Sequence, residues 1–150
     1  MLSGIIIAGL VFAAAATGGI FKPGEWYDGL NKPWWTPPGW AFPVVWTILY
    51  CMIAYAGWLV WGLGAVLSIV FWGAQLVING LWSYFFFGAK DMRKALVDVV
   101  LLWTLIAAFI IVTYPVSQLA AFLFMPYLLW VSIAAFLNFR MIQLNQNEVG

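Results

Sequence analysis

The sequence predicts an all-α membrane protein, a bundle of five transmembrane helices in one domain that covers residues 1–150. Of these residues, 66% are apolar and only 7% are charged, and the mean hydropathy is +1.01. A soluble globular domain carries about 25% charged residues, so this chain belongs in a lipid bilayer. Its apolar segments are about 20 residues long, the length of a membrane-spanning helix. Because they are continuously apolar rather than alternating, we expect helices and not barrel strands.

The first helix is expected over residues 4–21. The alanines at 13–16 imitate the cleavage site of a signal peptide, but no Lys or Arg precedes Lys22, so the basic region of a signal peptide is missing. We therefore expect a retained helix. Small residues at 13–19 would let a neighbouring backbone or a ligand approach closely, and both roles stay open at this point.

An aromatic loop is expected over residues 22–41. Its segment Lys32–Trp40 holds three prolines and three tryptophans. Proline fixes φ and has no N–H to donate, so this segment is neither an ordinary helix nor a central strand. Tryptophan favours the boundary between membrane and water. A stiff aromatic loop beside an apolar bundle is a candidate lid over a flat, apolar ligand.

The second and third helices are expected over residues 42–61 and 65–87. On the third, Gln75 and Asn79 are four residues apart and share one face, which Ser83 continues. Amides in hydrocarbon need hydrogen-bond partners, either on another helix or on a ligand. Trp46 and Tyr50 form a similar pair on the second helix. With 11 tryptophans in the chain, these faces indicate an aromatic-walled cavity for a planar ligand.

The fourth and fifth helices are expected over residues 93–114 and 116–142. Lys94 and Asp98 are four residues apart, so we expect an ion pair in which Asp98 is a structural partner rather than a proton carrier. Pro126 removes one helical hydrogen bond and predicts a kink in the fifth helix, shortly before Trp130.

The basic residues predict the orientation in the membrane. One face, which carries the N-terminus and the turns at 62–64 and 114–115, has no Lys or Arg. Positive loops stay in the cytoplasm, so the N-terminus is expected outside and the aromatic loop and the C-terminus inside a bacterial cell membrane. The six basic residues of the other face are Lys22, Lys32, Lys90, Arg93, Lys94 and Arg140.

The residues that are missing exclude several kinds of chemistry. The chain has no histidine and one cysteine, Cys51, which removes the usual ligands for haem and metal ions and the usual general base. No lysine lies at mid-membrane, so a retinal Schiff base is excluded. We expect no metal site, no obligatory cofactor, no conventional acid–base catalysis and no nucleic-acid partner.

Several motifs of rare residues follow one another along the chain. They are Trp26-Tyr27, Lys32-Pro33-x-Trp35-x-Pro37-Pro38-x-Trp40, Trp46-x-x-Leu49-Tyr50, Gln75-x-x-x-Asn79, Phe86-Phe87-Gly88-Ala89, Ala95-Leu96-Val97-Asp98, Pro126-Tyr127-x-x-Trp130 and Leu137-Asn138-Phe139. In this order and spacing they resemble the translocator protein family, whose bacterial members are the tryptophan-rich sensory proteins (TspO). The family fold is a five-helix membrane bundle.

The resemblance implies a sensor or receptor that binds tetrapyrroles such as protoporphyrin IX, and also drugs of the benzodiazepine-receptor type, in a pocket capped by the first loop. It also implies a homodimer, which small residues on the third helix support. Two other functions stay open: light-driven porphyrin degradation by Trp46 and Trp130, and transport of a porphyrin or a sterol. The implied ligand-binding residues are Trp46, Tyr50, Gln75, Asn79, Trp130, Ala134 and Leu137, with Trp34 and Trp35 in the lid.

The sterol-recognition segment departs from the pattern of the animal members. They place a tyrosine before the basic residue, whereas this chain reads Leu137-Asn138-Phe139-Arg140. The motif is weak even when it is complete, so cholesterol is not expected as the physiological ligand.

Overall fold

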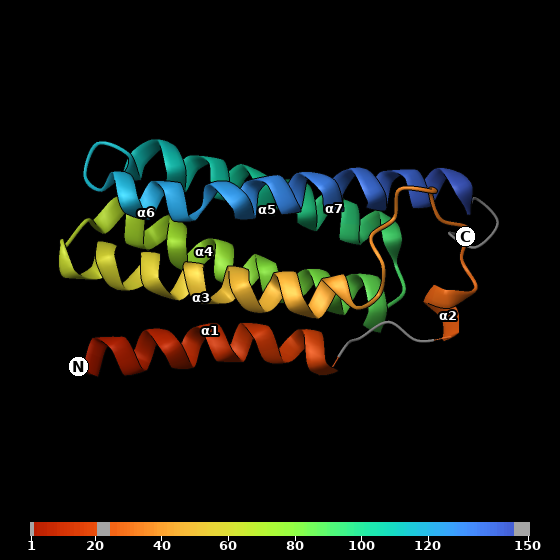
Figure 1. The fold of residues 1–150 in the computed structure, drawn as a ribbon, viewed down its shortest axis with the longest axis horizontal. Coiled ribbons are helices and arrows are strands. Elements are labelled where there is room, and N and C mark those ends of the chain that lie inside the picture. Colours follow the sequence, from red (N-terminus) through yellow and green to blue (C-terminus); the bar gives the residue numbers. More distant parts are fainter. Residues whose placement is uncertain (1, 21–24, 146–150) are drawn as a thin grey trace.

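The computed structural model describes residues 2–20 and 25–145, and every long element in these ranges is a helix that runs along the long axis of the molecule (Figure 1). The described residues contain no strand, which confirms the all-α prediction. The elements are α1 (Leu2–Ile20), α2 (Glu25–Asp28), α3 (Ala41–Gly62), α4 (Val66–Ser83), the π-helical turn η1 (Tyr84–Gly88), α5 (Met92–Thr113), α6 (Gln118–Leu123) and α7 (Met125–Leu144).

Four helical segments in the described part of the chain are long and apolar enough to cross a membrane. They are Ala41–Gly62, Val66–Gly88, Met92–Thr113 and Gln118–Leu144. The apolar stretch of α1, Leu2–Thr17, is shorter than these four. The prediction of five spans is therefore confirmed for four of them, and the crossing by α1 stays a prediction.

The last span is not the single helix predicted for residues 116–142. It is interrupted at Phe124, where α6 ends and α7 begins, and Pro126 falls in the first turn of α7. Proline is tolerated there because the N–H groups of a first turn have no helical acceptor. The ring of Phe124 stacks on Phe109 of α5, with ring centroids 4.0 Å apart. A disturbance of the helix near Pro126 was predicted correctly, but it is a break at Phe124, two residues before the proline.

Buried polar side chains join the central helices α4, α5 and α7. The Trp82 indole donates to Oδ1 of Asn138 at 3.2 Å, and Nδ2 of Asn138 donates to the Met92 carbonyl at 2.8 Å. Near the opposite end, the Thr113 hydroxyl donates to Ser68 at 2.8 Å. Each bond satisfies a polar group that would otherwise be costly in an apolar interior.

The loop before α3 is tied down along its length. Trp26 and Tyr27 pack edge-on against Phe86 and Phe87 of the η1 segment, at centroid distances of 5.6–6.1 Å. Trp35 stacks almost parallel on Phe136 of α7, with an interplanar angle of 8°. The loop therefore lies across the end of the bundle at which α7 finishes (Figure 1).

An amide clasp joins this loop to the C-terminal end of α7. The Asn31 N–H donates to Oδ1 of Asn145 at 2.8 Å, and Nδ2 of Asn145 donates to the Asn31 carbonyl at 2.8 Å. The same Nδ2 donates to the Met141 carbonyl at 2.8 Å, which fixes the amide on the last turn of the helix. The stiff loop expected from the prolines is thus also fastened to the last helix.

The predicted Lys94–Asp98 ion pair is wrong. Nζ of Lys94 lies 3.7 Å from Oδ2 of Asp91, and the Asp91 carboxylate also accepts the Lys94 N–H as the N-cap of α5. Asp98 is only 6% exposed, and its Oδ2 atom has no hydrogen-bond partner among the described residues. Asp91 and Asp98 lie about one turn on either side of Lys94, but only Asp91 is exposed to water beside the exposed lysine, so Asp91 forms the ion pair.

Candidate ligand-binding cavity

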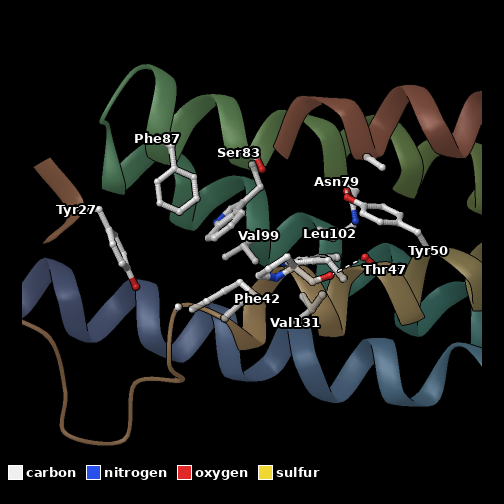
Figure 2. A pocket seen from close by; sticks show the side chains of 16 residues that line it. Tyr27, Phe42, Thr47, Tyr50, Asn79, Ser83, Phe87, Val99, Leu102 and Val131 are labelled. Carbon is white, nitrogen blue, oxygen red and sulfur yellow. Dashed lines mark hydrogen bonds between the residues drawn. The ribbon is translucent and has the colours of Figure 1, made fainter. Parts of the chain in front are cut away.

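A cavity of about 540 Å³ lies between the helices, on the inner side of the loop that precedes α3. Its volume falls in the usual range for small-molecule sites. Figure 2 shows Tyr27 and Phe87 at one end of it and Tyr50 and Asn79 at the opposite end. Its lining is mostly apolar and comes from all the long helices. The aromatic members are Tyr27, Phe42, Trp46, Tyr50, Trp82 and Phe87; the others are Ala15, Gly39, Pro43, Thr47, Asn79, Ser83, Val99, Leu102, Val131 and Ala134.

The aromatic wall centres on Trp46 of α3. Its ring stacks on Tyr50 one turn later, with centroids 5.4 Å apart and an interplanar angle of 27°. Tyr127 and Trp130 of α7 approach Trp46 edge-on, at 6.2 and 6.4 Å. Edge-to-face and offset-stacked contacts are the favoured geometries of aromatic pairs, so the Trp46 ring is held from behind while it lines the cavity.

The polar end of the cavity belongs to a chain of hydrogen bonds between α3, α4 and α7. The Tyr50 hydroxyl donates to Oδ1 of Asn79 at 2.8 Å, and Nδ2 of Asn79 donates to the Tyr127 hydroxyl at 2.6 Å. Tyr127 donates in turn to Oε1 of Gln75 at 2.8 Å, and Nε2 of Gln75 donates to the Trp72 carbonyl at 2.8 Å. The sequence left open whether the Gln75 and Asn79 amides bond to another helix or to a ligand. In the structure, both amides bond to residues of other helices.

Lys32 lies beside Tyr27 at the other end of the cavity, although it is not itself part of the lining. Nζ of Lys32 stands 4.6 Å from the centroid of the Tyr27 ring, within the range of a cation–π contact. It also donates to the carbonyls of Asp28 and Leu30, each at 3.3 Å. Burial, with the nearby Asp28 charge adding to it, raises the pKa of Tyr27, so its hydroxyl stays neutral at physiological pH. This end can therefore meet an anionic group.

The structure brings four of the residues proposed for the site into the cavity lining: Trp46, Tyr50, Asn79 and Ala134. Gln75 and Trp130 lie behind the lining, through the hydrogen-bond chain and the Trp46 contact respectively. The indole N–H of Trp130 is buried and has no hydrogen-bond partner among the described residues.

Three of the other proposed residues lie elsewhere. Leu137 is buried but outside the lining. Trp34 is 94% exposed, and Trp35 packs on Phe136, so neither lid tryptophan lines the cavity. In the sterol segment, Phe139 is exposed while Leu137 is buried, and Arg140 donates to Gln143. Leu137, Phe139 and Arg140 therefore do not form one shared surface for a sterol.

Sequence reasoning missed two important members of the site. Tyr127 is fully buried and is the hub of the hydrogen-bond chain, and Tyr27 closes one end of the cavity. A signal existed for Tyr127, since a hydroxyl in an apolar helix has to find a partner. Tyr27 lies on the short helix α2, inside the segment predicted as a loop, and the path of that segment does not follow from helical periodicity.

The small residues of α1 lie on two different surfaces. Ala15 lines the cavity, whereas Ala13, Ala14 and Thr17 line a shallow apolar groove between α1 and α4.

In the part of the chain that the structure describes, no group of three or more His, Cys, Asp or Glu side chains could hold a metal ion.

Fold and site together define the class: a helical membrane protein with an aromatic cavity inside the bundle and a loop fastened across one end. Residues 6–144 match the TspO/MBR family, and the chain belongs to this family. It is 45% identical over 137 residues to a tryptophan-rich sensory protein of Cereibacter sphaeroides, covering 91% of this chain and 87% of that protein.

Other relatives come from bacteria and animals. The protein CrtK of Rhodobacter capsulatus is 41% identical over 140 residues, which are 90% of this chain and 88% of that one. The translocator protein of Homo sapiens is 42% identical over 131 residues, which are 81% of this chain and 78% of that one.

Proposed function

We propose that this protein binds tetrapyrroles, with protoporphyrin IX as the test ligand, in the cavity between its helices, and that it acts as a membrane sensor or receptor for them. The observation that carries the proposal is the cavity itself, with stacked Trp46 and Tyr50 rings along a mostly apolar lining. Flat aromatic ligands gain from stacking on such a wall. Flat drugs of the benzodiazepine-receptor type would use the same wall.

The difference between the two ends of the cavity suggests how a tetrapyrrole would lie. The carboxylates of protoporphyrin IX suit the end with Tyr27, where the Lys32 cation is close. The macrocycle would then stack along Trp46, without an axial ligand from the protein. The chain has no histidine, so a metal-free macrocycle fits the lining at least as well as haem.

The test is a titration of the purified protein with protoporphyrin IX in the dark, followed by the Soret absorbance in detergent. We expect saturable one-site binding that weakens about tenfold in the double variant Trp46→Phe/Asn79→Ala. Trp61→Phe is the matched control, because Trp61 lies on α3 but outside the cavity lining, and its affinity should be unchanged. Equal, unsaturable signals in all three proteins would mean that the porphyrin merely partitions into micelles.

Light-driven degradation of the bound porphyrin is the second candidate. The edge-on contact of Trp46 with Trp130 favours it, since one indole reaches the cavity and the other supports it from behind. Under illumination, Trp46→Phe and Trp130→Phe should stop product formation while dark binding stays largely intact. Unchanged turnover in both variants would show that these two tryptophans do not carry out the degradation.

A homodimer that packs through α4, and a fifth membrane crossing by α1, belong to the same proposal. Within the chain, a side chain at Gly80 would meet Thr17, whereas Gly73 has open space around it and is free to face a second copy. Gly73→Trp should shift the purified protein from dimer to monomer in cross-linking, and Gly9→Trp on α1 should not.

The 19 residues of α1 would extend about 28 Å, close to the thickness of the hydrocarbon core.

A further inference from the structure

In the hydrogen-bond chain at the inner end of the cavity, each group has a fixed role as donor or acceptor. The backbone carbonyl of Trp72 determines these roles. The Trp72 carbonyl can only accept, so the Gln75 side chain must turn its Nε2 atom toward it, at 2.8 Å. Trp72 cannot shift easily, because its indole donates to the Ile53 carbonyl at 2.9 Å and its ring packs against Gly57.

Every further bond follows from that first one. With Nε2 of Gln75 turned away, its Oε1 atom faces Tyr127, which must donate to it. The Tyr127 hydroxyl has a single hydrogen, so toward Asn79 its oxygen can only accept, and Asn79 must present Nδ2. Oδ1 of Asn79 is then left for Tyr50, whose hydrogen is committed to it at 2.8 Å.

Tyr50 and Asn79 both line the cavity, and Tyr50 is the more accessible of the two. Tyr50 is half-buried, whereas Asn79 is 5% exposed and Gln75 is fully buried. The only hydrogen of the Tyr50 hydroxyl is already donated, so toward a ligand its oxygen can only accept a hydrogen bond. The polar end of the cavity is therefore an acceptor at this atom.

We infer that the inner end of the cavity selects ligands that carry a hydrogen-bond donor, a hydroxyl or an N–H, and that Gln75 sets this preference from behind. The inference rests on the proposed function. It names the ligand chemistry at the end opposite Lys32: a donor group is accepted by Tyr50, while an ether oxygen or a carboxylate meets lone pairs. Gln75 is a positioning residue, because it touches the chain and not the cavity.

Two flat probes that differ in one hydrogen-bond donor test this selectivity. 1-Pyrenemethanol and its methyl ether have the same ring system, and tryptophan emission excites pyrene, so binding is read as energy transfer in detergent. The measured quantity is the ratio of the two dissociation constants. Partition into micelles is the same for every protein variant, so the Tyr50→Phe protein supplies the reference ratio.

In the wild type, we expect the alcohol to be favoured about two- to tenfold more than in Tyr50→Phe, the range of one net hydrogen bond. Gln75→Met should bring the ratio to that of Tyr50→Phe or below it. Without the amide, Tyr127 can donate to Asn79, Asn79 can turn over, and the Tyr50 hydrogen is released toward the ligand. A loss of packing alone would weaken both probes equally and leave the ratio unchanged.

Two results would overturn the inference: equal ratios in the wild type and Tyr50→Phe, or a folded Gln75→Met protein that keeps the wild-type ratio. If Gln75→Met does not fold, the comparison of wild type with Tyr50→Phe still decides. Failure of the proposed function looks different, since then neither the pyrenes nor protoporphyrin IX would bind saturably.

Discussion

At the scale of single residues, Gly57 of α3 packs directly against the ring of Trp72 on α4. A Cβ atom built there would lie 2.4 Å from the Trp72 ring, so Gly57→Ala forces the indole away and breaks its bond to the Ile53 carbonyl. We expect a loss of about 1–3 kcal/mol in the free energy of unfolding, measured by denaturant titration in detergent.

The matched control is Gly9→Ala, on a helix with nothing within 4 Å of the added carbon. There the alanine should leave stability unchanged or raise it by about 0.5–1 kcal/mol, because glycine is a poor helix former. Equal effects of the two substitutions would contradict the close approach of α3 and α4.

Asp98 is the second residue with a clear stability consequence. Its carboxylate is buried, and one of its oxygens has no partner among the described residues. Asp98→Asn keeps the shape and removes a charge that is costly to bury, so we expect unfolding at neutral pH to require about 1–3 kcal/mol more. Asp91→Asn, at an N-cap position where asparagine serves equally well, should change little. A destabilised Asp98→Asn protein would show that the charge itself has a partner.

These residues also show what helical spacing can and cannot predict. The Gln75–Asn79 face was found because a period of 3.6 residues places both amides together. The same reasoning paired Lys94 with Asp98, and that failed because spacing says nothing about which carboxylate is buried by a neighbouring helix. Tyr127 was missed for a similar reason: its role depends on α4 lying opposite, which is a property of packing.

At the scale of elements, the amide clasp between the loop and α7 should control access to the cavity. Asn145→Ala removes both bonds to the Asn31 backbone, so we expect faster hydrogen exchange at the Asn31 amide and several-fold faster dissociation of a bound ligand. Hydrogen-exchange mass spectrometry and stopped-flow measurements would record the two effects.

Asn31→Ala is the matched control for the clasp. It keeps the backbone groups that bond to Asn145 and loses only a 3.4 Å contact with the Leu144 carbonyl. Both rates should stay close to those of the wild type. An unchanged Asn145→Ala protein would mean that the aromatic contacts alone hold the loop.

Hydrophobic length predicted the helices well and their interruptions less well. Each helix boundary from α3 to α5 lies within a residue or two of the one expected, apart from the π-helical end of α4, because apolar runs and turn residues determine both. A kink was predicted near Pro126, whereas the helix breaks at Phe124, whose stacking on Phe109 of α5 is a packing contact that the sequence pattern does not reveal. The loop path had the same limit, since prolines predict stiffness and not direction.

At the scale of the whole molecule, the distribution of charge predicts the orientation. The basic residues that the structure describes lie in the loop before α3, around the start of α5 and near the end of α7, all at one end of the bundle (Figure 1). In a Cys51→Ser background, a membrane-impermeant maleimide added to intact cells should label Leu63→Cys and not Ala89→Cys. Permeabilised cells should show both labelled. The reverse pattern in intact cells would place the loop outside.

The clasp also has a consequence for the order in which the chain matures. Asn31 and Asn145 are separated by 114 positions in a chain of 150, so the loop cannot be fastened until the last helix has been synthesised and inserted. Contacts so distant in sequence form late because the intervening chain must first be ordered. A chain still on the ribosome would thus lack both the α7 wall of the cavity and the fastened loop, so a ligand could be held behind the loop only after α7 has packed.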